Sequence, residues 1–277
     1  MKENLALVQR GFYNTVMSLP EDVRFRIGGA VAYVALFGPG YGGRTPRAKR
    51  EIYSYIDNLR TEKPAKLSEY IDIVDGYDKA VSGIENLPRG SYTIAINKPS
   101  YGVGRGFWMM FYLNHVVAEH NRKLGLDTEP VWIQHDGTMD LKFDGGVIEE
   151  HRKIISDKIS RLSGTILIGK SGALGNNEAK ARAATEVRDG GIVVVTPEGT
   201  PSKKLRRASR GAGSLLEMLG EKGSIIPAAA WISGKDELRL SFAEPIQLSP
   251  IEAEERKKLL IDKVMGEIAN LLPSDKK

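Results

Sequence analysis

Two segments of the sequence combine residue types that can move protons and bind anions. His135 and Asp140 are separated by four residues and follow the apolar run Val131–Ile133. A neutral imidazole can accept the proton of an attacking hydroxyl, and a nearby carboxylate can hold the imidazole in the required tautomer. Glu198 follows a second apolar run, Ile192–Val195, and precedes four basic residues: Lys203, Lys204, Arg206 and Arg207. The first segment predicts a general base with its orienting partner, and the second predicts a site for an anionic group.

The elements that must position these segments follow from hydrophobic patterning after Gly90, where short β-branched runs alternate with amphipathic stretches. We expect strands at 92–96, 131–134, 165–168, 192–196, 224–232 and 238–242. We expect helices at 107–122, 147–161, 177–188, 210–219 and 249–272. This alternation is typical of an α/β fold with a mixed, largely parallel sheet flanked by helices. The continuous apolar run at 192–195 fits a strand that is buried on both faces.

Residues 1–88 are expected to form an N-terminal helical region in front of an α/β domain at 89–277. Apolar residues recur at helical spacing within 5–16, and 27–37 is a second apolar helix candidate. The segments 47–59 and 66–84 have amphipathic helical patterns with many charges. The turn Pro88-Arg89-Gly90 sets the predicted boundary between the two parts.

Composition excludes several classes of protein. The 277-residue chain has no cysteine, which excludes a disulfide scaffold, a thiolate zinc site and a cysteine nucleophile. Its apolar windows 27–37 and 107–112 are shorter than the roughly 18–20 residues that cross a bilayer, and no secretion signal is recognisable. We therefore expect a cytoplasmic protein, and we leave open a peripheral position on the inner membrane face.

The charge balance favours anionic partners without choosing among them. Lysine and arginine number 40 against 35 aspartate and glutamate residues, which gives a net charge of +5. The basic residues are spread along the chain, and no nucleic-acid-binding motif is recognisable, so nucleic acid is not an expected partner.

Two glycine-containing patterns match nucleotide-binding loops only by letter. Gly164–Ser171 fits G-x-x-x-x-G-K-S, but the four residues between its glycines are predicted to form a strand instead of a loop of N–H donors. Gly102–Gly106 has the spacing G-x-G-x-G, one residue short of the dinucleotide fingerprint, and the expected acidic residue is missing. We expect neither pattern to bind a nucleotide.

The segment around Glu198 resembles a motif of the glycerolipid acyltransferase superfamily, whose members include lysophosphatidic acid acyltransferases. Thr196-Pro197-Glu198-Gly199-Thr200 is similar to the family's Phe-Pro-Glu-Gly-Thr-Arg motif. Three neighbouring segments follow in the family's order: Asp189-Gly190-Gly191 before the strand, Ile226-Pro227-Ala228 in a later strand, and Glu244-Pro245-Ile246 at the end. The resemblance covers roughly residues 92–248. The arginine that follows this motif in the family is replaced by Pro201, and the lysines and arginines at 203–207 are candidates to substitute for it.

The family's second hallmark, a histidine followed five residues later by an aspartate, fits this sequence in two registers. By residue type it matches His135 and Asp140. By strand order it falls after the first strand, where Asn97 and Ser100 fit but Lys98 replaces the histidine and Val103 replaces the aspartate. The motif is therefore either displaced to the neighbouring strand end or degenerate. A lysine is normally protonated at neutral pH, so residue chemistry favours His135 as the base.

The resemblance implies an enzyme that moves a fatty acyl group from a thioester, acyl-CoA or acyl carrier protein, to a hydroxyl of a lysophospholipid, glycerol phosphate or related acceptor. His135 is the expected base and Asp140 its partner. The expected substrate-binding residues are Glu198, Gly199, Thr200, Lys203, Lys204, Arg206, Arg207, Asn97, Lys98 and Ser100. The thioester is a co-substrate, and no bound cofactor or metal is expected. The alternative is a non-catalytic protein of the same fold that binds lipid or acyl carrier protein.

Overall fold

The computed structural model describes residues 45–99, 107–135, 162–168, 176–199, 202–234, 236–248 and 253–277. Its strands are β1 (Asp78–Ser82), β2 (Tyr92–Ile96), β3 (Pro130–His135), β4 (Ile166–Ile168), β5 (Ile192–Val195), β6 (Ser224–Ser233) and β7 (Glu237–Phe242). Its α-helices are α3 (Pro46–Arg60), α4 (Phe107–Lys123), α6 (Asn176–Arg188), α7 (Ala212–Gly220) and α8 (Ala253–Leu271). Three short 3-10 helices are η1 (Leu67–Val74), η2 (Ile84–Asn86) and η4 (Ser274–Lys276).

The strands form one mixed sheet in the order β1-β7-β6-β2-β5-β3-β4. The five strands from β6 to β4 are parallel, β7 is antiparallel to β6, and β1 is parallel to β7. Both β2 and β5 are buried along their whole length, as expected for central strands covered on both faces. The predicted fold class, an α/β protein with a largely parallel sheet flanked by helices, is confirmed.

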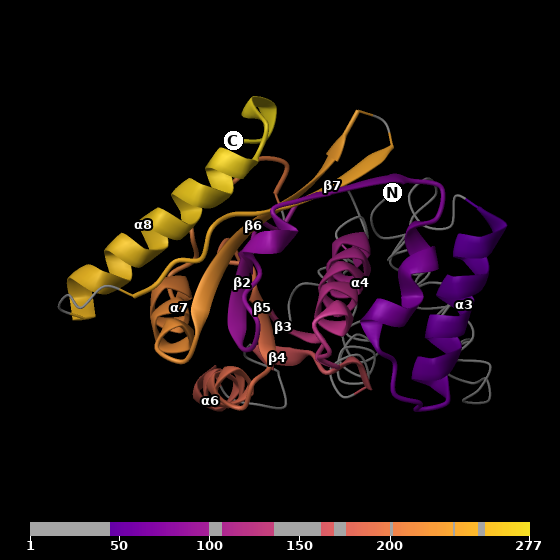
Figure 1. Ribbon diagram of the computed structural model, residues 1–277, viewed down its shortest axis with the longest axis horizontal. Helices are drawn as coiled ribbons and strands as arrows, with labels where there is room; N and C mark the ends of the chain where they lie inside the picture. Colours follow the sequence, from indigo (N-terminus) through magenta and orange to yellow (C-terminus); the bar gives the residue numbers. More distant parts are fainter. Residues whose placement is uncertain are drawn as a thin grey trace, which may run out of the picture.

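Helices cover both faces of the sheet (Figure 1). On one face, α4, with α3 and η1 beyond it, packs on the sheet in a core rich in large side chains, including Phe111 of α4, Trp132 of β3 and Tyr92 of β2. On the other face, α6, α7 and α8 contribute smaller aliphatic side chains, among them Ala183 and Leu216. Each face therefore has its own hydrophobic core, and the sheet lies between them.

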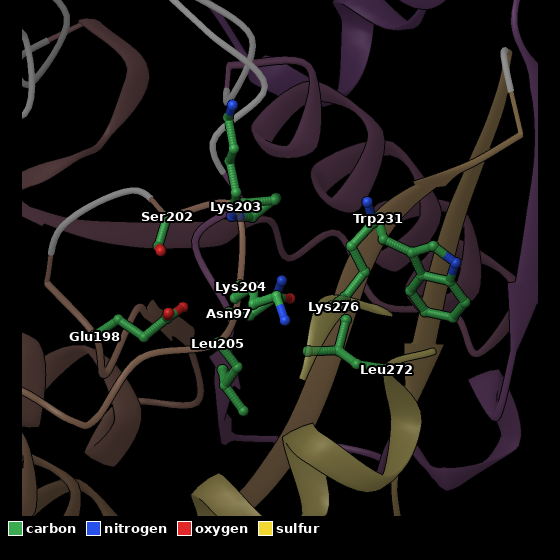
Figure 2. Close-up of a pocket in the computed structure, with 10 residues that line it drawn as sticks. Asn97, Glu198, Ser202, Lys203, Lys204, Leu205, Trp231, Leu272 and Lys276 are labelled. Atoms are coloured by element: carbon green, nitrogen blue, oxygen red, sulfur yellow. The ribbon is translucent and has the colours of Figure 1, made fainter. Parts of the chain in front are cut away.

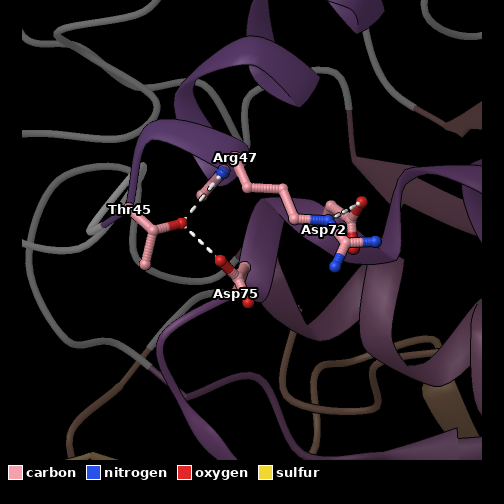
Figure 3. Close-up of polar contacts among 5 residues, drawn as sticks. Thr45, Arg47, Asp72 and Asp75 are labelled. Atoms are coloured by element: carbon pink, nitrogen blue, oxygen red, sulfur yellow. Dashed lines mark hydrogen bonds and ion pairs between the residues drawn. The ribbon is translucent and has the colours of Figure 1, made fainter.

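Polar contacts attach α3 to η1 at the start of the described chain (Figure 3). Thr45 caps α3 by accepting a hydrogen bond from the N–H of Ala48, 3.1 Å away. The Thr45 hydroxyl also donates to Asp75 at 2.5 Å, and the Arg47 guanidinium pairs with Asp72 at 2.6 Å. The cap and these two contacts fix the first turn of α3 against η1.

The predicted helix at 66–84 is wrong. The segment instead forms η1 and then β1, whose residues pair with β7 from Asp78↔Glu237 to Ser82↔Ser241. Its apolar residues were compatible with a helical repeat, but backbone pairing with the free edge of β7 decides the conformation of 78–82. The region 1–88 is consequently not wholly helical, because it supplies an edge strand to the sheet.

The other described strands and the α-helices agree with the sequence predictions to within a few residues, and η2 and η4 were not predicted. The six predicted strands correspond to β2–β7, and the segment between the glycines of the Gly164–Ser171 pattern contains β4, as expected. The predicted helices at 5–16, 27–37 and 147–161 and the glycine pattern at 102–106 lie outside the described residues. Within the described part of the chain, no helix has the length and apolar character required to span a membrane.

Candidate functional site

The site predicted around Glu198 lies where the chain leaves two neighbouring strands toward opposite faces of the sheet. From β2 the chain continues to α4, whose Leu113 packs in the core containing Ile94. From β5 it continues to α7, whose Leu216 packs in the opposite core with Val195. Such a switch point leaves a crevice at the carboxyl ends of the two strands, the usual ligand site of open α/β sheets.

Glu198 connects the loops that follow these strands. Lys98 and Glu198 each lie three residues beyond a residue of the pair Ala95↔Val195, so the parallel register brings them level. The Lys98 N–H donates to Glu198 Oε2 at 2.7 Å, and the Arg206 N–H donates to Oε1 at 2.7 Å. Each carboxylate oxygen therefore accepts from a different loop, which defines the backbone geometry of the site.

The Glu198 side chain is 6% exposed, and this burial affects its ionisation. Burial raises the pKa of Glu198 above its ordinary value, while the hydrogen bonds from Lys98 and Arg206 and the positive charges of these residues act in the opposite direction. Hydrogen bonds from N–H groups to a carboxylate are stronger than neutral ones, so the two bonds offset part of the cost of burying the ionised form.

Lys98 lies beside Glu198 and is also removed from solvent. Its ammonium Nζ donates to the Gly199 carbonyl at 3.4 Å. Burial lowers the pKa of Lys98 to about 8, and the negative charge of Glu198 partly offsets this effect. A lysine with this pKa is partly neutral at slightly alkaline pH, unlike an exposed lysine.

Asn97 joins the end of β2 to β6. Its amide Nδ2 donates to the Ala230 carbonyl at 3.0 Å, and its Oδ1 accepts from the Ala230 N–H at 2.7 Å. The side chain is 6% exposed and reproduces the pair of bonds that a backbone neighbour would make. Asn97 therefore holds the first residue after β2 in a fixed position.

A pocket opens beside Glu198 and is bounded by four parts of the chain (Figure 2). The segment 202–207, here called the basic loop, contributes Ser202, Lys203, Lys204 and Leu205. The Ser202 N–H donates to the Lys98 carbonyl at 3.0 Å, and Ser202 forms a parallel bridge with Pro99, so this loop runs beside the one after β2. The remaining lining residues are Asn97, Pro99, Glu198, Trp231, Leu272 and Lys276.

The structure brings together seven of the predicted site residues: Asn97, Lys98, Glu198, Gly199, Lys203, Lys204 and Arg206. Arg207 lies on the basic loop with an exposed side chain and is not among the residues that line the pocket. Ser100, Asp140 and Thr200 lie outside the described residues.

His135 is the last residue of β3, and only its backbone position is described. Its backbone pairs with Ile168 of β4, and β3 lies on the side of β5 away from β2. With neighbouring strands about 4.8 Å apart, the backbones of β2 and β3 are roughly 10 Å apart across β5. His135 ends β3 and Lys98 follows β2, so the two residues lie on opposite sides of the strand that leads to Glu198. The assignment of His135 as the base stays a prediction.

Sequence reasoning missed six residues that line the pocket: Pro99, Ser202, Leu205, Trp231, Leu272 and Lys276. Trp231 lies in β6, and Leu272 and Lys276 follow α8 at the end of the chain. The apolar character of Leu272 indicated only a helix face, and no local motif marks a lysine near a chain end as part of a site. The described residues contain no group of three or more histidine, aspartate or glutamate side chains arranged to hold a metal ion.

Comparisons with known proteins give a likeness among solved structures and none among sequences. No family model matches the chain, and no curated protein matches it. Among solved structures, the chain is similar to the crystal structure of the 1-acyl-sn-glycerophosphate (LPA) acyltransferase PlsC from Thermotoga maritima, with 15% identity and a TM-score of 0.47. The alignment covers 90% of this chain and 97% of that one. A likeness at this identity and TM-score does not establish a family or an activity for the chain.

Proposed function

We propose that the chain is an acyltransferase that moves a fatty acyl group from a thioester to a hydroxyl of an anionic acceptor. The observation that carries the proposal is the position of Glu198, within the Pro-Glu-Gly-Thr segment, at the switch point between β2 and β5. Its carboxylate binds the backbone of Lys98 and of Arg206 and so presents a basic loop beside a pocket. The motif and the geometry at the strand ends support the same site.

The lining of the pocket supports an acceptor with a negative charge and an apolar part. The exposed side chains of Lys203 and Lys204 supply positive charge. Leu205, Trp231 and Leu272 supply apolar surface beside them. A lysophospholipid or glycerol phosphate derivative carries both properties, with the lysines acting as point charges for its phosphate. Arg206, Arg207, Thr200 and Ser100 are proposed as further acceptor contacts.

In the proposed reaction, His135 accepts the proton of the acceptor hydroxyl while the oxygen attacks the thioester carbonyl. Asp140 holds the imidazole and stabilises its cationic form. Collapse of the tetrahedral intermediate breaks the C–S bond, and the proton passes from His135 to the departing thiolate. The products are an ester and free coenzyme A or acyl carrier protein, and this balance requires no further reactant.

The neighbourhood of Lys98 supports a second candidate function. By strand order Lys98 stands where the resemblance expects the catalytic histidine, and its ammonium donates to the Gly199 carbonyl. A chain with its base lost would bind a lipid or acyl carrier protein without transferring the acyl group. The two functions differ in whether free thiol is released.

The experiment is a thiol-release assay with purified protein, palmitoyl-CoA or palmitoyl-acyl carrier protein, and lysophosphatidic acid or glycerol 3-phosphate as acceptor. We expect acceptor-dependent thiol release by the wild type and a fall of about 10²–10⁴-fold in His135→Ala, the usual contribution of a general base. His115→Ala is the matched control, because His115 lies on α4 and contacts the Ser68 carbonyl at 3.2 Å. Undiminished activity of His135→Ala would remove His135 as the base. Lipid binding without thiol release in the wild type would favour the non-catalytic function.

A further inference from the structure

The end of the chain forms one side of the pocket beside Glu198. After α8, the turn η4 places the Lys276 carbonyl 2.8 Å from the N–H of Leu205 in the basic loop. The turn is closed by a 2.9 Å bond from the Lys276 N–H to the Pro273 carbonyl. Leu272 and Lys276 line the same pocket as Glu198, from its opposite side (Figure 2). The C-terminal residues are therefore attached to the segment that carries the predicted anion-binding lysines.

The position of this turn is determined by the packing of α8. Val264, Ile268 and Leu272 are buried in the core on the α6–α8 face of the sheet. Leu272 is 4% exposed and belongs to the same core as Trp231 of the pocket wall. Because the helix leads directly into the turn, its buried face fixes where residues 273–276 lie. The turn at 273–276 is therefore a fixed part of the pocket wall.

The surroundings of the Lys276 ammonium group allow it to bind an anion. Glu198 already accepts two backbone hydrogen bonds, one at each oxygen. The Lys276 ammonium pairs with Asp275 at 3.2 Å, but the Asp275 side chain is 71% exposed and that of Lys276 is 29% exposed. Because the Asp275 carboxylate is mostly in water, its attraction for the ammonium is screened, and a phosphate can compete with it. In the view of Figure 2 the side chains of Lys203 and Lys276 extend toward the same side of the pocket.

We propose that Lys276 is a ligand-binding residue, which the C-terminal turn contributes to a phosphate site shared with Lys203 and Lys204. The phosphate lies among the three ammonium groups, and an attached apolar chain lies against Trp231 and Leu272. This inference rests on the anionic acceptor of the proposed function and deepens it. The resemblance to acyltransferases ends near residue 248, so it assigns no role to this turn.

The test is titration calorimetry of the full chain with dodecyl phosphate below its micelle concentration at low salt. We expect Lys276→Gln to weaken binding about five- to tenfold, since it removes one charge-assisted contact. The matched control is Lys277→Gln, which removes a charge from the next residue, whose side chain is exposed. We expect that variant to bind within twofold of the wild type. Equal affinities of the two variants would overturn the proposal.

Additional arms identify the ligand and separate the two proposals. Asp275→Asn should tighten binding about two- to threefold, because it removes a carboxylate that competes with the phosphate for Lys276. Weaker binding of inorganic phosphate than of dodecyl phosphate, with both lowered by Lys276→Gln, identifies a lipid phosphate; equal binding, with both lowered, identifies free phosphate. If only Lys203→Gln and Lys204→Gln weaken binding, Lys276 is excluded while the anionic acceptor stands. If the wild type binds neither ligand, both proposals fail. Thermal unfolding checks that every variant is folded.

Discussion

The polar residues of the site fall into two groups that differ in burial and in bonding. The inner group, Asn97, Lys98 and Glu198, is largely buried and bonded to backbone atoms of neighbouring segments. The basic side chains of the basic loop, Lys203, Lys204, Arg206 and Arg207, are exposed. Both groups were predicted to bind substrate, yet their surroundings suit them to different tasks.

One predicted site therefore contains two parts, a scaffold of buried side chains and a contact surface of exposed ones. Removing an inner side chain leaves buried backbone donors or acceptors without partners, which costs free energy of folding. Removing an exposed lysine changes the charge seen by a ligand with little effect on folding. The comparison therefore predicts that stability and ligand affinity respond to different residues.

Glu198→Ala should have the largest effect. It deprives the N–H groups of Lys98 and Arg206 of their acceptor, and we expect the free energy of unfolding to fall by about 4 kcal/mol. Urea denaturation measures this change. Glu255→Ala, at an exposed position on α8, is the control and should stay within about 0.5 kcal/mol of the wild type. Similar losses in both variants would show that Glu198 does not act as a scaffold.

Lys98→Met should change how the stability of the protein depends on pH, because it removes a buried ammonium group. The pKa of Lys98 is about 8 in the folded chain against an ordinary value of 10.5. Between these values the unfolded chain binds the proton and the folded chain does not, so wild-type stability rises with pH in this window. The stability of the wild type relative to Lys98→Met should therefore increase by up to about 3 kcal/mol from pH 7.5 to pH 10.5.

The control for this pH series is Lys63→Met, which removes a lysine at an exposed position. Its stability relative to the wild type should be nearly constant over the same range. A flat profile for Lys98→Met as well would place the Lys98 ammonium in contact with water and remove Lys98 from the inner group.

Asn97→Ala should lower the free energy of unfolding by about 2 kcal/mol, because two bonds to the Ala230 backbone are lost at a buried position. Asn86→Ala is a graded control, since Asn86 makes one side-chain bond, at 3.1 Å to the Phe242 carbonyl, and is partly exposed. We expect the free energy of unfolding to fall by about 1 kcal/mol in Asn86→Ala. Urea denaturation of both variants compares their losses of unfolding free energy. A loss in Asn97→Ala no larger than that in Asn86→Ala would contradict the proposal that Asn97 holds the end of β2 to β6.

The double variant Lys203→Gln/Lys204→Gln should have the smallest effect on folding, less than about 0.5 kcal/mol. Its effect should appear instead in the KM for an anionic acceptor, which we expect to rise about tenfold at low salt and less at high salt. Lys222→Gln, at an exposed position before β6, is the control. A loss of stability without a change in KM would reverse the roles of the two groups.

Much of the fold was predictable because its signals are local. The apolar runs at 92–96 and 192–195 form the central strands β2 and β5 as expected. The segment 78–82 was not predictable, because its conformation depends on pairing with β7, more than 150 residues later in the chain. Local periodicity carries no information about such a partner.

The site was predictable in part for the same reason. Glu198 was marked by its motif and Lys98 by strand order, but the hydrogen bond between them was not predicted, because it depends on the parallel register of β2 and β5. The two hydrogen bonds between the Asn97 side chain and the Ala230 backbone likewise depend on β6 lying next to β2.

By itself, the sequence determined the fold class, the strands that end at the site and the residue types available there. These properties follow from side-chain chemistry and from short-range hydrophobic periodicity, which are local. The packing of the chain sets which charges are buried and which backbone groups they bind, and it brings Lys276 to the pocket beside Glu198. Burial and long-range contacts arise when the strands pair and α8 packs against the sheet. They therefore cannot be inferred from local patterns in the sequence.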